Sequence, residues 1–210
     1  MNNQEKIDTI KNWLGSGTII LFGRPFAGKD YQSNQLARLF EGNSASSGDI
    51  LRNSVLPKHV EEAMAVGELV PTNDFVNIVL PYLSQPALAN KPLILSSFGR
   101  WHGEEEGVIR AVENSKHPLK AVIYLKMSDD DIFNRWNTKE HTERHNRVDD
   151  SLDILKKRLI VFSEKTLPVL DYYKNLGLLI TVDGRPIKDE VTNNVIDTLY
   201  EKANRVLTLQ

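Results

Sequence analysis

The segment best suited to chemistry is a glycine-containing loop near the N-terminus. Residues 23–30 read Gly-Arg-Pro-Phe-Ala-Gly-Lys-Asp and directly follow the apolar run 18–22. Gly23, Gly28 and Lys29 match the Gly-x-x-x-x-Gly-Lys pattern of a phosphate-binding loop between a strand and a helix. Backbone N–H groups of such a loop converge on phosphate oxygens at the positive end of the helix, and the lysine adds a point charge. The loop therefore predicts a site for a phosphate-bearing ligand.

Asp30 is the residue that departs from a simple phosphate site. The pattern normally has Ser or Thr after the lysine, whereas this chain has Asp30 there. A carboxylate suits a free helix N-terminus, but it would repel a phosphate at the same place unless a metal ion lay between them. Three interpretations stay open: Asp30 is a metal ligand, the loop has lost its activity, or the segment is only a turn between a strand and a helix.

The elements that must position this loop alternate between strand and helix. Apolar runs of strand length are found at 18–22, 93–97, 121–125 and 178–182, and a less hydrophobic strand is expected at 43–45. Helical periodicity is clearest at 31–40, 75–83, 104–114, 151–170 and 188–203. Strands that are apolar on both faces need cover on both faces. We therefore expect an α/β fold of three layers, with a five-stranded parallel sheet between helices.

Four further motifs follow the loop along the chain. They read Ser-Ser-Gly-Asp-Ile-Leu-Arg at 46–52, Gly-Glu-Leu-Val-Pro at 67–71, Ser-Phe-Gly-Arg at 97–100 and Arg-Val-Asp-Asp at 147–150. Together with the loop, their order and spacing resemble those of adenylate kinases over about residues 17–195. The resemblance implies a single P-loop NTPase domain over 1–210, with an insert for the nucleoside monophosphate at 46–75 and a short lid at 136–148.

The resemblance also implies which residues bind ATP and promote transfer. The expected ATP-binding residues are Gly23, Pro25, Phe26, Ala27, Gly28, Lys29, Asp30, Tyr31 and Arg135. Phosphoryl transfer spreads negative charge over the phosphate oxygens, so catalysis consists largely of positioning the reactants among cations. The expected catalytic cations are Lys29, Arg100, Arg135, Arg147 and Arg158, with Arg144 as a substitute in the lid. The alternative for each arginine is a solvated surface cation.

The resemblance also implies residues for the acceptor and the metal. By resemblance, the acceptor monophosphate contacts Ser47, Arg52, Leu69, Val70, Phe98, Arg100 and Glu104. Arginine suits the α-phosphate because its planar fork meets two oxygens at once. Asp49 would help to order the water around a Mg²⁺ ion that accompanies ATP. The simpler interpretation makes Leu69 and Val70 core residues, and makes Ser47 and Asp49 caps of a helix.

Five residues depart from the family pattern. Phe26 and Asp30 stand at family glycines, Tyr31 at a threonine, Ser96 at an aspartate and Gly99 at the usual proline. Ser96 removes one carboxylate from the magnesium shell, and we hypothesise that Asp30 replaces its charge, holding the metal through water.

Glu104 lies near the family position of a glutamine that reads adenine. An ionised glutamate can only accept hydrogen bonds, so it would suit guanine, which presents two donors, better than adenine. Alternatively, Glu104 is part of an acidic first helical turn.

Composition limits the classes of partner. The formal net charge of −2 and the pI near 6.2 provide no basic field for nucleic acid or an anionic membrane, so small ligands are favoured. The chain has no cysteine, which excludes disulfides, cysteine-based zinc sites and thiol nucleophiles. No secretory signal or membrane span is evident, so we expect a cytoplasmic protein. The resemblance also implies a monomer, and no heptad pattern or long apolar surface run argues otherwise.

Three functions follow from these patterns. The leading hypothesis is a magnesium-dependent kinase that moves the γ-phosphoryl group of ATP to a nucleoside monophosphate, with AMP as the expected acceptor and two ADP as products. The second is a nucleotide-binding protein of the same fold with little or no transfer activity, which the altered loop motivates. The third is a kinase with another acceptor, such as GMP, CMP or UMP.

Overall fold

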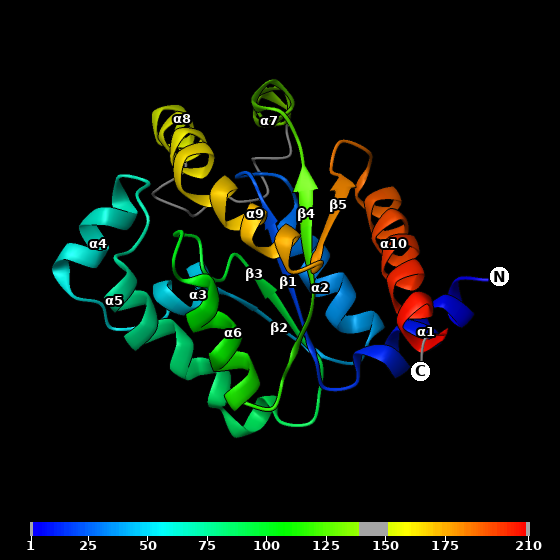
Figure 1. Cartoon of the computed structure of the whole chain (residues 1–210). Helices are drawn as coiled ribbons and strands as arrows, with labels where there is room; N and C mark the ends of the chain where they lie inside the picture. The colour runs from blue at the N-terminus through cyan, green and yellow to red at the C-terminus, as the bar shows by residue number, and fades with distance from the viewer. Residues whose placement is uncertain (1, 139–150, 209–210) are drawn as a thin grey trace.

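The computed structural model describes residues 2–138 and 151–208, and a parallel sheet runs through its centre (Figure 1). Its strands are β1 (Thr18–Gly23), β2 (Asn43–Ser46), β3 (Leu93–Ser96), β4 (Leu119–Lys126) and β5 (Leu179–Asp183). They lie in the order β2-β3-β1-β4-β5, and every neighbouring pair is parallel. The five-stranded parallel sheet expected from the sequence is therefore confirmed.

Helices and helical turns connect the strands. The α-helices are α1 (Asn3–Leu14), α2 (Lys29–Leu39), α3 (Ser47–Arg52), α4 (Lys58–Ala65), α5 (Thr72–Asp74), α6 (Glu105–Asn114), α7 (Asp129–Asn137), α8 (Leu152–Val161), α9 (Leu167–Asn175) and α10 (Lys188–Thr208). Tighter and wider helical turns occupy Phe75–Val79 (π), Leu80–Ser84 (3-10), Pro86–Leu88 (3-10) and Phe162–Thr166 (π).

Two segments expected as regular helices are interrupted. The segment 75–83 is helical but changes from a π turn to a 3-10 turn, and 151–170 contains a π turn between α8 and α9. Each interruption lies next to a proline, Pro81 or Pro168. Proline removes a backbone donor and crowds the preceding turn, so a regular α-helix does not continue through it.

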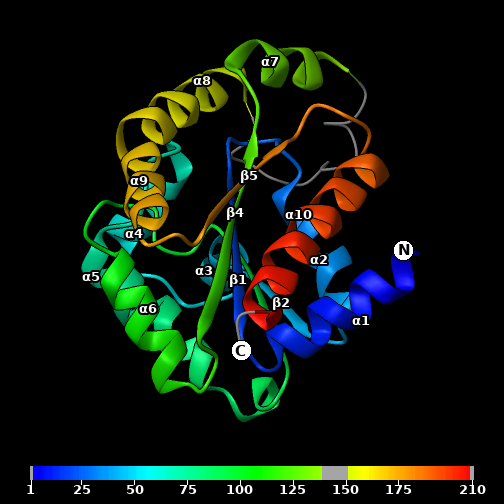
Figure 2. The same cartoon turned by 45° about the vertical axis from the view of Figure 1, so that its right-hand side comes forward.

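The sheet is apolar on both faces, as the sequence predicted. Ile19 and Leu21 of β1 belong to the core on the side of α1, α2 and α10, whereas Ile20 and Phe22 belong to the core on the side of α6 and α9. Successive side chains of a strand point to opposite faces, so the uninterrupted apolar run fills both cores. Figure 2 shows these two helical layers on either side of the sheet.

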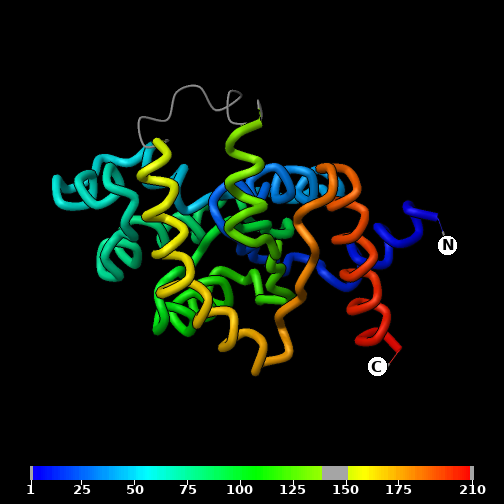
Figure 3. Tube along the Cα trace, turned by 90° about the horizontal axis from the view of Figure 1, so that it is seen from above, coloured from blue at the N-terminus to red at the C-terminus, as the bar shows by residue number. Residues whose placement is uncertain are grey.

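The carboxyl ends of β1 and β3 place two loops side by side. The two strands are paired, with Leu21 opposite Ser96, and the Ser97 N–H donates to the Leu21 carbonyl at 3.0 Å. The loop after β1 therefore adjoins the loop after β3, and ligands of open α/β sheets bind at this edge. Figure 3, which views the molecule from above, shows α7 and α8 over the same edge. Over residues 2–138 and 151–208, no helix combines the length and the apolar character that a membrane span needs.

Candidate active site

The loop after β1 has the geometry of an anion site. Gly28 adopts the left-handed conformation (φ 87°) as the N-cap of α2, and no side chain of the described residues caps that helix start. A β-carbon would be strained at this backbone conformation, so the position requires glycine. Uncapped N–H groups at a helix start attract anions. The Lys29 ammonium donates to the Arg24 carbonyl at 2.9 Å, which holds the lysine against the loop.

Phe26 keeps a left-handed backbone (φ 62°) although it has a side chain. Its ring is only 8% exposed and packs edge-to-face on Trp136 of α7, with ring centroids 5.0 Å apart. Left-handed backbone costs a non-glycine residue about 1–2 kcal/mol. Burying an aromatic ring contributes more than that, since Phe→Ala changes in cores cost about 3–5 kcal/mol. The departure at Phe26 therefore joins the loop to α7 through apolar contact.

Replacing Phe26 by glycine is expected to destabilise the fold by about 2 kcal/mol, because the lost ring burial outweighs the relieved backbone strain. Urea unfolding monitored by circular dichroism measures the change. The matched control is Phe26→Ala, which loses the ring but keeps the strain, so it should be about 1 kcal/mol less stable than the glycine variant. A glycine variant more stable than the unmodified protein would contradict this account.

Asp30 and Ser96 meet beneath the loop. The Ser96 hydroxyl donates to Asp30 Oδ1 at 2.8 Å, and Ser96 is fully buried at the end of β3. Two of the five departures from the family pattern are thus in direct contact. A carboxylate and a hydroxyl present hard oxygen ligands, which Mg²⁺ and its water shell prefer.

A first cavity of about 160 Å³ opens between this loop and the insert. Its lining includes four cations, Lys29, Arg52, Arg100 and Arg158. Apolar side chains cover another part of its wall, among them Leu51, Met64, Leu69, Val70, Phe75 and Trp101. Three carboxyl groups also line it, from Asp30, Glu68 and Glu104. We call this space the acceptor cavity.

Arg100 is held in an unfavourable electrostatic setting. Burial and the nearby Arg158 guanidinium lower the pKa of Arg100 to about 10, and Glu104 opposes that shift. Arg100 therefore stays charged at neutral pH. Two cations brought together in a partly buried space repel each other unless an anion lies between them. An oxyanion such as a phosphate would remove that repulsion.

The other residues expected at the acceptor differ in how they meet the cavity. Ser47, Leu69 and Val70 line it and are nearly buried. The Ser47 hydroxyl donates to the Ser97 carbonyl at 2.7 Å, so it does not cap α3. Phe98 is fully buried, packs near Phe75 with ring centroids 6.2 Å apart, and supports the wall without lining it.

Arg52 and Asp49 form an ion pair within α3. Arg52 Nη2 lies 2.6 Å from Asp49 Oδ1, and both side chains are partly exposed. Arg52 lines the acceptor cavity, whereas Asp49 lines a neighbouring groove that it shares with Asp30. Asp49 does not cap α3. It lies in the first turn of that helix, and its carboxylate pairs with Arg52.

A second cavity of about 600 Å³ lies on the other side of the loop. Ala27, Gly28, Tyr31 and Arg135 line it, and Phe26 and Asp30 line both cavities. We call this second space the donor cavity.

The remaining residues expected to bind ATP lie elsewhere or point away. Gly23 ends β1, and Pro25 lines the acceptor cavity instead of the donor cavity. Tyr31 is turned towards α10, where its hydroxyl donates to Asp189 at 3.1 Å and this bond raises the pKa of Tyr31.

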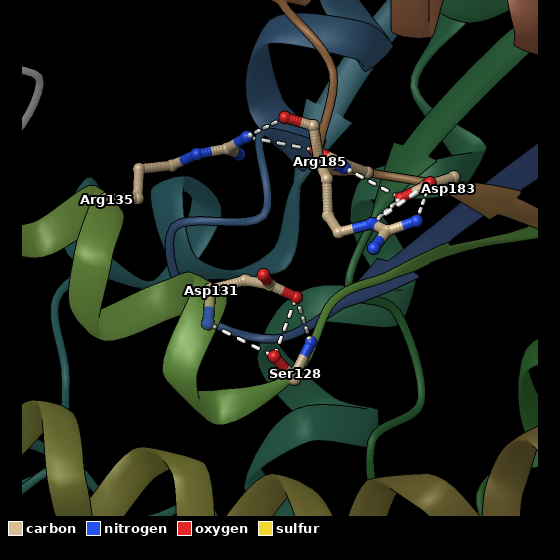
Figure 4. A network of polar contacts seen from close by, with 6 residues as sticks. Ser128, Asp131, Arg135, Asp183 and Arg185 are labelled. Carbon is tan, nitrogen blue, oxygen red and sulfur yellow. Dashed lines mark hydrogen bonds and ion pairs between the residues drawn. The ribbon is translucent and has the colours of Figure 1, made fainter.

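Arg135 of α7 joins the two sides of the donor cavity. Its guanidinium donates to the carbonyl oxygens of Phe26 at 3.1 Å, Gly184 at 2.9 Å and Arg185 at 3.4 Å. Figure 4 shows it reaching from α7 towards the turn after β5. In that turn the Arg185 side chain donates to Asp183 and holds the pKa of that carboxyl at about 2. Arg135 therefore fixes α7 over the loop.

Several lining residues were not predicted from the sequence. Trp101 Nε1 donates to the Val70 carbonyl at 3.1 Å, so Trp101 connects the β3–α6 loop to the insert. The Lys165 ammonium lies over the Trp101 ring, 5.2 Å from the ring centroid. Arg185 and Lys188 line the donor cavity. A sequence signal could have indicated Arg185 and Lys188: the turn-forming run Asp-Gly-Arg-Pro at 183–186. The described residues do not include Arg144, Arg147 or most of the expected lid at 136–148.

This fold and site define a P-loop protein: a parallel sheet, a Gly-Lys loop at the start of a helix after β1, and two cavities on either side of that loop. A family model described as adenylate kinase matches residues 21–178. The chain belongs to the adenylate kinase family, whose members are phosphotransferases.

Individual relatives agree with the family match. An adenylate kinase of Parvibaculum lavamentivorans is 36% identical over 183 residues, which cover 84% of this chain and 89% of the relative. An adenylate kinase of Synechococcus is 31% identical over 189 residues, covering 86% and 97%. One of Staphylococcus epidermidis is 29% identical over 211 residues, covering 86% and 98%. The similarity thus extends over nearly the whole length of each relative.

Proposed function

We propose that this protein transfers the γ-phosphoryl group of ATP to AMP and so forms two ADP. The family to which the chain belongs supports phosphoryl transfer to a nucleoside monophosphate, and the relatives named adenylate kinase favour AMP as the acceptor. ATP is assigned to the donor cavity and AMP to the acceptor cavity. The loop with Lys29 lies between them, where the transferred group must pass.

One observation carries the proposal: Lys29, Arg52, Arg100 and Arg158 all line the acceptor cavity, directly beside the phosphate-binding loop. Negative charge develops on the equatorial oxygens of a phosphoryl group in transit, and prearranged cations stabilise that charge. A set of four cations in a space of about 160 Å³ suits a ligand with a phosphate group.

Each residue is assigned a role by its position. Backbone N–H groups at Gly28 and the Lys29 ammonium bind the β- and γ-phosphates of ATP, and Arg135 orients the donor nucleotide. Arg52 and Arg100 bind the α-phosphate of the acceptor, and Arg158 neutralises charge on the transferred group. Ser47, Leu69 and Val70 surround the acceptor base. An acceptor phosphate oxygen then attacks the γ-phosphorus in line with the departing β-phosphate oxygen, and ADP is the leaving group.

Magnesium is assigned to the oxygen ligands beside the loop. In the part of the chain that the structure describes, no group of three or more His, Cys, Asp or Glu side chains could hold a metal by itself. Mg²⁺ commonly keeps several waters and binds one or two carboxylates together with substrate phosphates, so Asp30 with Ser96 fits it, with Asp49 in the adjoining groove. When bound, the ion would neutralise part of the negative charge of the ATP phosphates.

The function is tested by a coupled assay of diphosphate formation with ATP, Mg²⁺ and each of AMP, GMP, CMP, UMP and dTMP. We expect turnover that is fastest with AMP. Measurable ATP binding without turnover for any acceptor would instead favour a nucleotide-binding protein, a role that Asp30 at the start of the loop helix motivates. Turnover restricted to another monophosphate would overturn the assignment of AMP.

Replacing Asp30 by asparagine is expected to raise the Mg²⁺ concentration needed for half-maximal activity about tenfold, because the variant keeps the shape of the side chain but loses its charge. The measurement is a Mg²⁺ titration of the initial rate at fixed ATP and AMP. Asp189→Asn is the matched control, since that carboxylate bonds to Tyr31 and lines neither cavity. An unchanged titration in the Asp30 variant would rule out the metal assignment.

A further inference from the structure

Glu104 carries a buried acceptor atom that nothing in the described protein satisfies. The residue is 5% exposed, and its Oε2 accepts the Trp101 N–H at 3.1 Å. Its Oε1 is buried and has no hydrogen-bond partner within residues 2–138 and 151–208. Burying an unpaired acceptor is costly, and a donor on a ligand would remove that cost. Because Glu104 lines the acceptor cavity, such a donor can come from the acceptor itself.

The chemistry of the cavity decides which part of the acceptor Glu104 meets. A carboxylate facing a phosphate would be repelled, and the cations of the cavity already provide for the phosphate. Apolar side chains, including Leu69, Val70 and Trp101, line the same space and suit a flat heterocycle. Glu104 is thus a lining group able to exchange hydrogen bonds with the edge of a base.

The surroundings of Glu104 raise its pKa. Burial raises its pKa, and Glu105 adds to that effect, whereas the Trp101 and Arg100 backbone and the Thr72 hydroxyl lower it. Charged or titratable groups next to Glu104 are Arg100 of the β3–α6 loop, Glu105 of α6 and Tyr173 of α9. The cavity that Glu104 lines also contains Lys29 and Asp30 of α2, Arg52 of α3, Glu68 of the insert and Arg158 of α8. The carboxyl therefore changes its charge at a pH above that of an exposed glutamate.

We propose that Glu104 selects the acceptor base by its own protonation: the neutral acid binds adenine and the carboxylate binds guanine. A neutral carboxyl donates from one oxygen and accepts at the other, which matches the N1 acceptor and the N6 amino donor of adenine. A carboxylate only accepts, which matches the N1–H and N2 amino donors of guanine. This inference rests on the proposed function, because it assigns the acceptor to this cavity.

The sign of the pH dependence follows from these two forms. The acid form is present below the raised pKa and is lost as pH rises through it, so affinity for AMP should fall and affinity for GMP should rise. The phosphate of each nucleotide also titrates, near pH about 6, but it does so in both ligands and cancels from the ratio of the two affinities. The AMP-to-GMP affinity ratio therefore isolates Glu104.

The experiment is calorimetric binding of AMP and of GMP to the whole protein from about pH 5 to pH 8, beside the coupled assay. We expect the AMP-to-GMP ratio to fall about tenfold per pH unit above the pKa of Glu104. Glu104→Gln, an amide that donates and accepts at every pH, should prefer AMP by a ratio that does not change with pH. Glu106→Gln, an exposed change on the same helix, should behave as the unmodified protein.

Two results would overturn the inference: a ratio independent of pH in the unmodified protein, or the same pH dependence in the Glu104 variant. The pH dependence of the affinity ratio is measured on the unmodified protein, so the inference can be tested even if Glu104→Gln does not fold. Because binding is measured directly, pH-dependent binding without turnover would refute the proposed transfer activity while supporting the assignment of Glu104. Turnover with a constant ratio would do the reverse.

Discussion

Replacing Lys29 by alanine is expected to lower kcat about a thousandfold, while ATP still binds. The lysine ammonium lies at the start of α2 beside the acceptor cavity, where the transferred group would pass. A cation at this point stabilises charge that is greatest in the transition state, so its loss acts mainly on kcat and less on binding. Backbone N–H groups of the loop remain in the variant and continue to hold the phosphates.

The measurement is the initial rate at saturating ATP and AMP, with ATP affinity determined separately by calorimetry. Lys11→Ala is the matched control, because that lysine pairs with Glu41 on the far surface and should leave both quantities unchanged. Since Lys29 also donates to the Arg24 carbonyl, a thermal unfolding curve checks that the loop remains folded. Activity within about tenfold of the unmodified protein would refute the role of Lys29.

Replacing Arg100 by alanine is expected to reduce kcat/KM for AMP by about three orders of magnitude, because the variant loses a cation assigned to the α-phosphate of AMP, and charge-assisted hydrogen bonds from arginine to phosphate are among the strongest in proteins. Stability should not fall, because the charged form of Arg100 is disfavoured by burial and by Arg158. A simple structural role would lower stability and activity together. The combination of unchanged stability with a large kinetic loss therefore distinguishes phosphate binding from scaffolding.

Kinetics with AMP varied at saturating ATP, together with urea unfolding, provide the two readouts. Arg100→Lys keeps the charge but not the planar fork, so its activity should lie between those of the alanine variant and the unmodified protein. Arg110→Ala is the control, since Arg110 is exposed and pairs with Glu106 on α6. The assignment fails if Arg100→Ala loses no more activity than Arg110→Ala.

Much of the fold was predictable because strong local signals agree with the topology. The run Thr18–Phe22 is apolar from Ile19 onward and buried throughout, as expected of a strand covered on both faces. The start of α7 also had a readable signal that was not used: Ser128 caps the helix and Asp131 completes a capping box, yet no helix was expected there. Helices α3 and α4 were missed because they are short, with six and eight residues.

The sequence indicated a set of candidate residues but not their geometry. Motif spacing indicated Lys29, Arg52, Arg100 and Glu104, and all four line one cavity. The contact between Asp30 and Ser96 depends on the pairing of β1 with β3 across more than sixty intervening residues, which no local pattern encodes. Likewise, the unsatisfied Glu104 oxygen depends on how tightly α6 packs, so its consequence for base choice emerged only from the structure.

Phe26 and Asp30 line both cavities, and this shared wall has a thermodynamic consequence. A ligand on one side that shifts either side chain changes the free energy of binding on the other side. Such coupling is reciprocal: whatever factor the first nucleotide applies to the affinity of the second, the second must apply to the first. Order of addition then has no effect on the stability of the ternary complex. Phe26 and Asp30 are placed to set the size of that factor.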